Sequence, residues 1–344
     1  MKIGLIGAGA VARSHAEAAT TLPEVQISAV CDLNQEAARS LAATHGARSF
    51  TDYRDLIAEG GADAVIISTP HSLHHEMVLA AARAGLDVLV EKPMAIEAAE
   101  CVQMQQACAD AEVHLAVGHI QHFLPDKVAA REAVFGGRIG EVVLVHDYRS
   151  TDYRPGTRAE WFFRPEIAGG GALMNIGAHM VDRCSWLTGA RFTQVEARLQ
   201  YRFGVGVETD ADLRLELAGG IPATITVVSA PPATVDEVLL VGSTGTIVAD
   251  PRRGTFLRDE DGVHVLHEAG EEDIPQAFVT QLRGFADFVA GRAQFAVDTQ
   301  DSIAVIATVQ GAYRSAREGG PVQLPEPAEL AAATAGASGG PGER

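Results

Sequence analysis

The sequence opens with Met1-Lys2-Ile3-Gly4-Leu5-Ile6-Gly7-Ala8-Gly9-Ala10-Val11-Ala12, a short apolar run that leads into a G-x-G-x-x-A turn. The apolar run predicts a buried strand, and the alanine-rich residues from about 11 to 19 predict a helix directly after the turn. Glycines in such a turn let the backbone approach a pyrophosphate, whose charge the start of the helix favours. We therefore expect a dinucleotide to be bound by Gly7, Gly9, Ala10 and Val11.

Strand-like and helix-like stretches alternate through the first third of the chain. Apolar runs rich in β-formers recur at 2–6, 25–31, 64–69, 88–90 and 113–117, and stretches of good helix formers lie between them at about 11–19, 34–44, 72–84 and 97–109. Continuous apolar strands that alternate with helices indicate a parallel sheet that is covered on both faces. The predicted fold class is α/β, with an N-terminal Rossmann domain built on a doubly wound parallel sheet.

The pattern changes after about residue 122. Strand-like runs follow at 139–148, 191–203, 210–217, 221–229, 235–241 and 245–249, several separated by only a turn, and helices are expected at about 275–290 and 300–317. These runs predict a C-terminal α/β domain with a mainly antiparallel sheet. We place the two domains at 1–121 and 122–325. The tail at 326–344 is rich in small residues and is expected to be disordered.

Charge and composition restrict the partners. Among 344 residues there are 27 Lys and Arg against 45 Asp and Glu, a formal charge of −18, which offers no polycationic surface for nucleic acid or for a membrane. No run of 18 apolar residues could span a bilayer. The four cysteines, Cys31, Cys101, Cys108 and Cys184, form no CxxC pair and are expected to be buried thiols. The opening residues do not read as a secretory signal, so a cytoplasmic protein is expected.

Asp32 indicates which dinucleotide is bound. It ends the second predicted strand, 25 residues after Gly7, where an acidic residue accepts hydrogen bonds from the ribose diol of NAD. A carboxylate there repels the 2′-phosphate of NADP, and Leu33 and Asn34 supply no cation to balance it, although Arg39 could reach inward. We therefore expect NAD rather than NADP. The competing interpretation is a structural glycine turn with a solvent-facing Asp32.

Two polar clusters follow other predicted strands of the first domain, Thr69-Pro70-His71-Ser72-Leu73-His74-His75-Glu76 and Glu91-Lys92-Pro93. Ligands of open parallel sheets collect at the carboxyl ends of the strands, where both clusters stand. His71 and His75 have the spacing of two metal ligands on a helix, but no third ligand with suitable spacing is apparent, and no metal is expected. Pro93 restricts the backbone of Lys92, which predicts a positioned lysine.

A further cluster runs from Gly169 to Asp182 as GGGALMNIGAHMVD and reads as a glycine loop that enters a helix. The spacings of four and three place Asn175, His179 and Asp182 on one helical face. A histidine among polar neighbours is a candidate proton carrier, and the alternative is a structural histidine whose hydrogen bonds are satisfied.

Taken together, these motifs resemble the Gfo/Idh/MocA oxidoreductases, named for glucose-fructose oxidoreductase and inositol dehydrogenase. The segments GAGAVA, TPHSLHHE, EKP, VGHIQHFLP, GGGALMNIGAHMVD and VGSTGTI occur in the order of that family, and GAYRSAREGGPVQLP matches its closing helix. The resemblance implies a Rossmann domain followed by an α/β domain whose open sheet often forms the oligomer interface. It also implies a substrate bound between the domains and chemistry on sugars, polyols or their derivatives.

The resemblance also implies the roles of individual residues. Lys92 matches the family lysine that contacts substrate and nicotinamide ribose, Pro93 then follows a cis bond, and His179 matches the catalytic histidine. Many members carry an aspartate at the position of Asn175. Because asparagine lacks the negative charge of aspartate, His179 is expected to be a weaker base. Gln121 and His122 replace a basic pair. The cofactor site is completed by Thr69, Pro70, His74 and Glu91, and the substrate site by His119, Tyr153, Arg154, Trp161 and Arg164.

The resulting hypothesis is an NAD(P)-dependent dehydrogenase that moves a hydride between nicotinamide and a secondary hydroxyl or ketone of a cyclic sugar, polyol or sugar derivative. Lys92, His179 and Asn175 are its expected catalytic residues. One alternative is a glycoside hydrolase of the same fold that uses bound NAD transiently, and another is a cofactor- or sugar-sensing regulator without catalysis. A homodimer or homotetramer is expected, because an open sheet face needs a partner.

Overall fold

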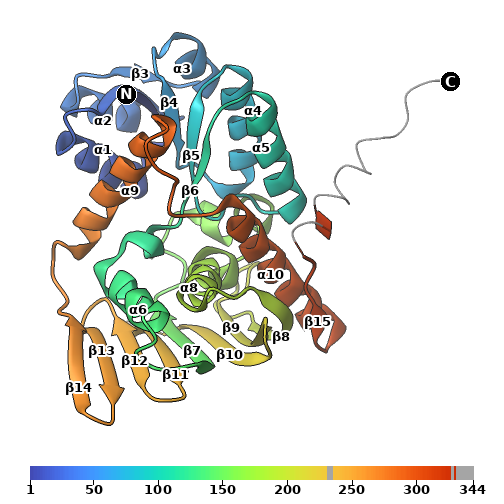
Figure 1. The fold of residues 1–344 in the computed structure, drawn as a ribbon. Coiled ribbons are helices and arrows are strands. Elements are labelled where there is room, and N and C mark those ends of the chain that lie inside the picture. The colour runs from blue at the N-terminus through green and yellow to red at the C-terminus, as the bar shows by residue number, and fades with distance from the viewer. Residues whose placement is uncertain (231–234, 327–328, 331–344) are drawn as a thin grey trace. The chain divides into compact units, whose positions relative to one another are not determined.

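The computed structural model describes residues 1–230, 235–326 and 329–330, so residues 331–344 of the predicted disordered tail lie outside the described residues. The chain forms two compact units (Figure 1). The first unit consists of residues 1–118, 282–307 and the described residues from Pro325 onward. The second unit consists of residues 119–281 and 308–324. The chain thus returns to the first unit after the predicted domain boundary at residue 122.

The first unit contains a six-stranded sheet in which every neighbouring pair is parallel. The strand order is β3-β2-β1-β4-β5-β6. The chain builds outward from β1 to β3 and then crosses back to place β4 on the other side of β1. This arrangement confirms the predicted Rossmann fold. The strands are β1 (Lys2–Ile6), β2 (Gln26–Cys31), β3 (Arg48–Phe50), β4 (Ala64–Ile67), β5 (Asp87–Glu91) and β6 (Leu115–Gly118).

Helices connect these strands. They are α1 (Ala10–Thr20), α2 (Gln35–Thr44), α3 (Tyr53–Glu59), α4 (His74–Arg83) and α5 (Ala98–Asp110), with a short 3₁₀ turn, η1 (His71–Leu73), before α4. The helices α4 and α5 pack side by side (Figure 1). The side chain of Asn34 accepts two backbone N–H groups at the start of α2, and Asp52 accepts one at the start of α3. All four residues of β4 are buried, as expected for a parallel strand covered on both faces.

The second unit contains a nine-stranded sheet of order β14-β13-β12-β11-β7-β10-β9-β8-β15. Every neighbouring pair is antiparallel except β7 and β10, which are parallel. The prediction of a mainly antiparallel sheet is therefore confirmed. The strands are β7 (Val142–Thr151), β8 (Phe192–Gln200), β9 (Asp210–Leu217), β10 (Ile221–Ser229), β11 (Asp236–Gly242), β12 (Thr246–Asp250), β13 (Gly254–Asp259), β14 (Gly262–His267) and β15 (Val322–Gln323).

The helices of the second unit include one feature that sequence spacing does not predict. Residues Leu173–Gly177 form a π-helical turn, η4, directly before α8 (Ala178–Thr188). Asn175 therefore lies in the π turn, and the α-helical spacing that placed it on one face with His179 and Asp182 does not hold through that turn. The other helices are η2 (Ile120–Phe123), α6 (Pro125–Phe135), η3 (Glu160–Phe163) and α7 (Pro165–Ala168), and α9 (Asp273–Val289) and α10 (Thr299–Glu318) each contribute residues to both units.

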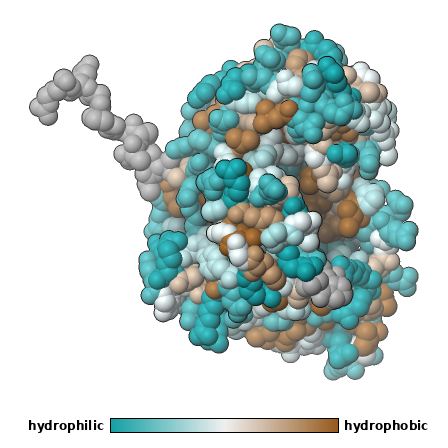
Figure 2. Space-filling model, turned by 180° about the vertical axis from the view of Figure 1, so that it is seen from behind, coloured by the Kyte–Doolittle hydropathy of each residue, from teal (hydrophilic) through white to brown (hydrophobic). Residues whose placement is uncertain are grey.

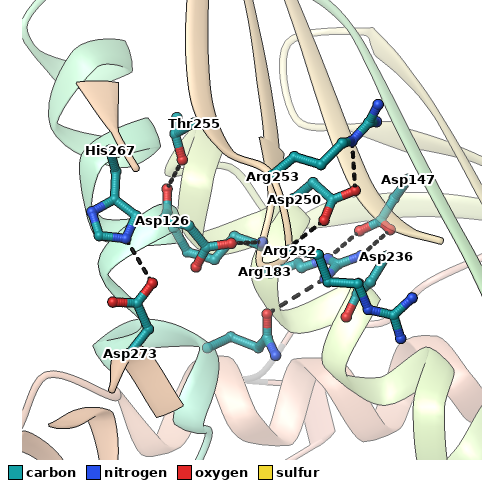
Figure 3. Close-up of polar contacts among 12 residues, drawn as sticks. Asp126, Asp147, Arg183, Asp236, Asp250, Arg252, Arg253, Thr255, His267 and Asp273 are labelled. Atoms are coloured by element: carbon teal, nitrogen blue, oxygen red, sulfur yellow. Dashed lines mark hydrogen bonds and ion pairs between the residues drawn. The ribbon is translucent and has the colours of Figure 1, made fainter. Parts of the chain in front are cut away.

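A buried charge cluster fixes α8 to the sheet of the second unit (Figure 3). The fully buried Arg183 guanidinium of α8 binds both carboxylate oxygens of Asp147 on β7 and lies 2.6 Å from Asp236 on β11. Lys127 of α6 is also fully buried and is paired with Asp126. Because each buried cation has a carboxylate partner, desolvation is offset by ion pairing, and α8 is held in one place on the sheet.

One face of the molecule is mainly polar (Figure 2). Figure 2 shows hydrophilic residues over most of one face, with apolar residues in scattered groups. Within the described ranges, no helix has the length and apolar character needed to cross a bilayer. All four cysteines are buried free thiols, as predicted.

Candidate active site

The glycine turn lies between β1 and α1, at the carboxyl edge of the parallel sheet. Gly7 has φ of +108°, and a Cβ there would lie 2.7 Å from the carbonyl oxygen of Ser68, so only glycine fits. Gly9 precedes the first turn of α1, and a Cβ there would meet no atom within 4 Å. The start of α1 is therefore uncovered on that side, as an anion-binding helix terminus requires.

Asp32 is held beside this turn by backbone groups. One carboxylate oxygen accepts the N–H of Ala8 and the other accepts the N–H of Asn34, both at 2.8 Å. In the described part of the chain Asp32 forms no ion pair, so its negative charge is not neutralised. Leu33, the next residue, is 89% exposed. The arrangement is suited to a ribose diol and unsuited to a second phosphate.

Lys92 directly follows β5 and is more exposed to solvent than the residues on either side of it. From Val88 to Ala95 every residue except Lys92 is buried. The bond between Lys92 and Pro93 is cis, as the resemblance implied. The lysine side chain is thus displayed from a rigid buried segment at the carboxyl edge of the sheet.

His74 joins two of the predicted cofactor segments. Its ring nitrogens lie 2.9 Å from the carbonyl oxygens of Thr69 and Pro93, and the side chain is buried. Burial lowers the pKa of His74, although each carbonyl favours a bound proton. The structure therefore brings the Thr69-Pro70 segment and the Lys92-Pro93 segment together, with His74 as the brace between them.

Glu91 is placed by a residue that the sequence analysis missed. The Nε2 atom of His15 on α1 lies 2.8 Å from Oε1 of Glu91, and both side chains are almost completely buried. The backbone N–H of Lys92 donates to the other oxygen at 3.3 Å. A Cβ on Gly118, in the neighbouring β6, would lie 2.8 Å from the same carboxylate. The glycine leaves room for the Glu91 carboxylate, which holds the backbone N–H of Lys92.

The glycine run of the second unit packs against a buried carboxylate. Oε1 of Glu208 accepts hydrogen bonds from the N–H groups of Gly171 and Leu173 and from the Tyr313 hydroxyl, at 2.8 to 2.9 Å. Burial raises the pKa of Glu208. A Cβ on Gly171 would lie 2.0 Å from the carbonyl oxygen of Glu208. Close backbone approach to Glu208 therefore explains glycine at position 171.

His179 stands out in the segment that follows. From Gly170 to Cys184 every residue except His179 is buried. Asp182 is turned to two other histidines: its oxygens lie 3.3 Å from Nδ1 of His119 and 3.0 Å from Nε2 of His122. Burial alone would raise the pKa of Asp182, but the two imidazoles hold it well below its usual range. His119, predicted to bind substrate, thus contacts a buried carboxylate.

Tyr153 and Asn175 are neighbours in the interior of the second unit. Tyr153 is fully buried, its hydroxyl donates to the carbonyl oxygen of Phe162 at 3.2 Å, and the Asn175 side chain hydrogen bonds the same hydroxyl. Burial raises the pKa of Tyr153, so the hydroxyl stays protonated at neutral pH. Tyr153, predicted to bind substrate, is therefore a hydrogen-bond partner of Asn175.

The three other predicted substrate residues lie on the loop between β7 and the glycine run. Arg154 is paired with Asp152, with N–O distances of 2.5 and 2.8 Å, and Arg164 is paired with Glu166 at 2.8 Å. The Trp161 ring stacks on Phe162 with 3.7 Å between the ring centres. The same loop carries Arg158, which the sequence analysis did not select and whose Cζ lies 4.7 Å from the centre of the Tyr153 ring.

The geometry of these residues indicates the class of protein. A parallel sheet with an uncovered helix start, a fixed acidic residue after β2 and a lysine after β5 is a dinucleotide-binding site of the Rossmann type. Across the described ranges, no group of three or more histidine, cysteine, aspartate or glutamate side chains is placed to hold a metal ion. The residues present fit NAD, because Asp32 is un-neutralised and the turn at Gly7 and Gly9 is open to a pyrophosphate.

Comparison with known families agrees with this class. A family model described as "Oxidoreductase family, NAD-binding Rossmann fold" matches residues 1–119, and one described as "GFO/IDH/MocA C-terminal domain" matches residues 128–248. The chain belongs to the Gfo/Idh/MocA oxidoreductases and carries their NAD-binding Rossmann fold. The predicted family, fold class and cofactor are thereby confirmed.

Individual relatives match along most of their length. The rhizopine catabolism protein MocA of Rhizobium meliloti is 28% identical over 90% of this chain and 93% of its own. Inositol 2-dehydrogenase 1 of Saccharopolyspora erythraea is 28% identical over 94% of this chain and 96% of its own. The solved WlbA dehydrogenase of Bordetella pertussis, in complex with NADH and UDP-GlcNAcA, is 27% identical with a TM-score of 0.81 and covers 94% of this chain and 98% of its own.

Proposed function

We propose that this enzyme is an NAD-dependent dehydrogenase that oxidises a secondary hydroxyl of a cyclic sugar, polyol or sugar derivative, or reduces the corresponding ketone. The observation that carries the proposal is made separately in each unit: Lys92 in the first and His179 in the second are each the one partly exposed residue of an otherwise buried segment. A reactive ammonium and a proton carrier, each on a rigid support, are the two groups that alcohol oxidation needs beside the cofactor. The names of the relatives, which include an inositol dehydrogenase, support the substrate class.

Each residue has a defined task in the proposed reaction. Bound NAD supplies the hydride acceptor at its nicotinamide ring. The Lys92 ammonium stabilises negative charge that develops on the substrate oxygen, and the His179 imidazole takes the hydroxyl proton, an effect of about 10²- to 10⁴-fold. Asn175 is held by Tyr153 and orients the substrate or the imidazole. Because Asn175 carries no charge, it does not stabilise the imidazolium as an aspartate would.

The cofactor residues follow from the same proposal. Gly7, Gly9, Ala10 and Val11 receive the pyrophosphate, and Asp32 receives the ribose diol. Thr69 and Pro70 lie along the nicotinamide, with His74 and Glu91 as positioning residues. We assign cofactor binding to residues 1–121 and substrate binding and assembly to residues 122–325.

We also propose a cytoplasmic homo-oligomer. Four buried free thiols suit a reducing compartment. In the second unit, Val263 and Val265 on the edge strand β14 are 59% and 54% exposed, and Val143 on β7 is 47% exposed. Exposed apolar side chains on an edge strand and on an inner strand of the same sheet favour association with a second copy. Light scattering at micromolar concentration is expected to give a dimer or tetramer, and a monomer would contradict the assembly.

The experiment that tests the function begins with the cofactor. NADH and NADPH are titrated separately into the protein, with nicotinamide fluorescence as the signal, and the preferred oxidised cofactor is then offered with polyols, aldoses and sugar acids. We expect tighter binding of NADH than NADPH and NADH formation with at least one sugar. Failure to bind either cofactor would remove the dehydrogenase function.

A further inference from the structure

Three guanidinium groups lie on the loop of the second unit that precedes the glycine run, and they differ in their partners. Arg154 is neutralised by Asp152 and Arg164 by Glu166. Arg158 donates through Nη2 to the Thr151 hydroxyl at 3.1 Å, while its Nε atom is buried without a hydrogen-bond partner. Among the residues that the structure describes, no carboxylate forms an ion pair with Arg158.

The Arg158 guanidinium is held on a rigid aromatic platform. Its Cζ atom lies 4.7 Å from the centre of the Tyr153 ring and 5.8 Å from that of Phe162. Tyr153 is fully buried and is fixed by its own hydrogen bonds, so the ring does not move away from the cation. Burial lowers the pKa of Arg158, and the nearby cation Arg149 acts in the same direction, while Tyr153 and Asp152 act in the opposite direction. The cation is thus partly desolvated, and the nearby carboxylate Asp152 is already paired with Arg154.

The platform connects Arg158 to the candidate catalytic segment. Arg158 lies over the ring of Tyr153, and the hydroxyl of the same tyrosine is hydrogen bonded by the Asn175 side chain. Asn175 is in the π turn that leads directly into α8, four residues before His179. These residues all belong to the second unit. Arg158 is therefore linked, through Tyr153 and Asn175, to the segment that carries His179.

A partly buried guanidinium without an ion pair of its own is unfavourable unless a ligand supplies the counter-charge. The lack of an ion-pair partner for Arg158 is unexpected, because the chain has 45 acidic residues against 27 Lys and Arg. The planar fork of arginine suits the bidentate geometry of a carboxylate or a phosphate better than that of a neutral hydroxyl. We propose that Arg158 binds an anionic substituent of the substrate, so that the enzyme acts on a sugar acid or a sugar phosphate in preference to a neutral polyol. This inference rests on the proposed function.

The test uses the NADH complex and measures binding by calorimetry, which does not depend on turnover. Glucuronate supplies the carboxylate, glucose 6-phosphate supplies the phosphate, and glucose is the neutral counterpart. We expect one of the two anionic sugars to bind at least about 10-fold tighter than glucose, and the arm that binds identifies the anion. The variant Arg158→Gln is expected to lose about 10- to 100-fold in affinity for that sugar, and Arg158→Lys to recover part of it. Affinity for NADH is expected to stay unchanged.

The matched control is Arg253→Gln. Arg253 belongs to the same unit, is 63% exposed and already pairs with Glu237 and Asp250. It is expected to bind the anionic sugar as the parent does. The proposal is overturned if neither anionic sugar binds more tightly than glucose, or if Arg158→Gln weakens glucose and the anionic sugar equally. The proposed function fails separately, by absence of NADH binding in the same calorimeter.

Discussion

His15 of α1 and Glu91 at the end of β5 form a buried pair in which Nε2 and Oε1 lie 2.8 Å apart. The helix that carries His15 begins directly after the glycine turn at Gly7 and Gly9, and the strand that carries Glu91 ends directly before Lys92. The pair therefore ties the start of the cofactor site to the candidate catalytic lysine within one unit. Loss of either partner leaves a buried polar group without its counterpart.

Replacing the carboxylate tests this relationship. Glu91→Ala is expected to lower the free energy of unfolding by about 3–5 kcal/mol, because His15 stays buried without its acid. Urea unfolding measures the change. Asp287→Ala is the control, since it removes an ion pair with Arg292 in which the side chains are 34% and 57% exposed, and about 0–1 kcal/mol is expected. Equal losses in the two variants would show that the buried pair is not special.

Lys92 is one of only three lysines in the chain, with Lys2 and Lys127. Lys92→Met is expected to lower kcat/KM by about 10²- to 10³-fold, because the positive charge that stabilises the substrate oxygen is removed. Affinity for NADH is expected to fall by at most about threefold, since one ribose contact is lost, and thermal unfolding is expected to match the parent. Lys2→Met removes an exposed lysine and is expected to have no effect on the rate. Turnover of Lys92→Met at the parent rate would exclude the proposed role.

Asp32→Asn tests cofactor selection. The amide keeps an oxygen that can accept the N–H of Ala8 but removes the charge that repels a 2′-phosphate. We expect the dissociation constant for NADH to rise about 10-fold and the preference for NADH over NADPH to shrink. Asp52→Asn, at the start of α3, keeps its helix cap and is expected to leave both affinities unchanged. A full NADH preference in Asp32→Asn would place selectivity elsewhere.

Acid stability depends on Asp236. Burial would raise the pKa of this carboxyl, but Arg183, Arg149 and Lys127 hold it well below its usual range. The unfolded chain titrates near about 3.9, so the stabilisation is complete above that pH and is lost as the pH falls toward the folded-state pKa. Asp236→Asn is expected to be about 3 kcal/mol less stable at neutral pH and to lose less between about pH 5 and about pH 2. Urea unfolding across this range checks both, and identical acid slopes would contradict the assignment.

The sequence predicted the elements whose pattern is strong. The strands of the first unit are continuous apolar runs, because both faces of a parallel sheet are buried, and β1, β2, β4, β5 and β6 were all expected. The strand β3 has three residues, two of them exposed, which gives no such run. The edge strand β14, its neighbour β13 and the helices α3 and α6 were also not predicted. The π turn at Leu173–Gly177 was missed because an added residue in one turn leaves no trace in the apolar pattern.

Some residues of the candidate site could also be predicted from the sequence, and others could not. Lys92 and His179 could be selected because each stands in a local motif, after a strand or after a glycine run. The hydrogen bonds around the glycine run and α8 join residues that are far apart in the sequence. His122 contacts Asp182 across 60 residues, and Tyr313 donates to Glu208 across 105. Such partners depend on tertiary packing and have no local signature. His15 had a signal, since it falls on the buried stripe of α1 with Ala12, Ala16 and Ala19.

The most direct test of the central claim is the stoichiometry of NADH formation with the best sugar from the substrate screen. Sugar consumed and NADH formed are measured in the same reaction with excess NAD. A dehydrogenase gives one NADH for each sugar oxidised, and this is the result we predict. Release of a cleaved sugar without accumulation of NADH would contradict it and would identify an NAD-dependent glycoside hydrolase instead.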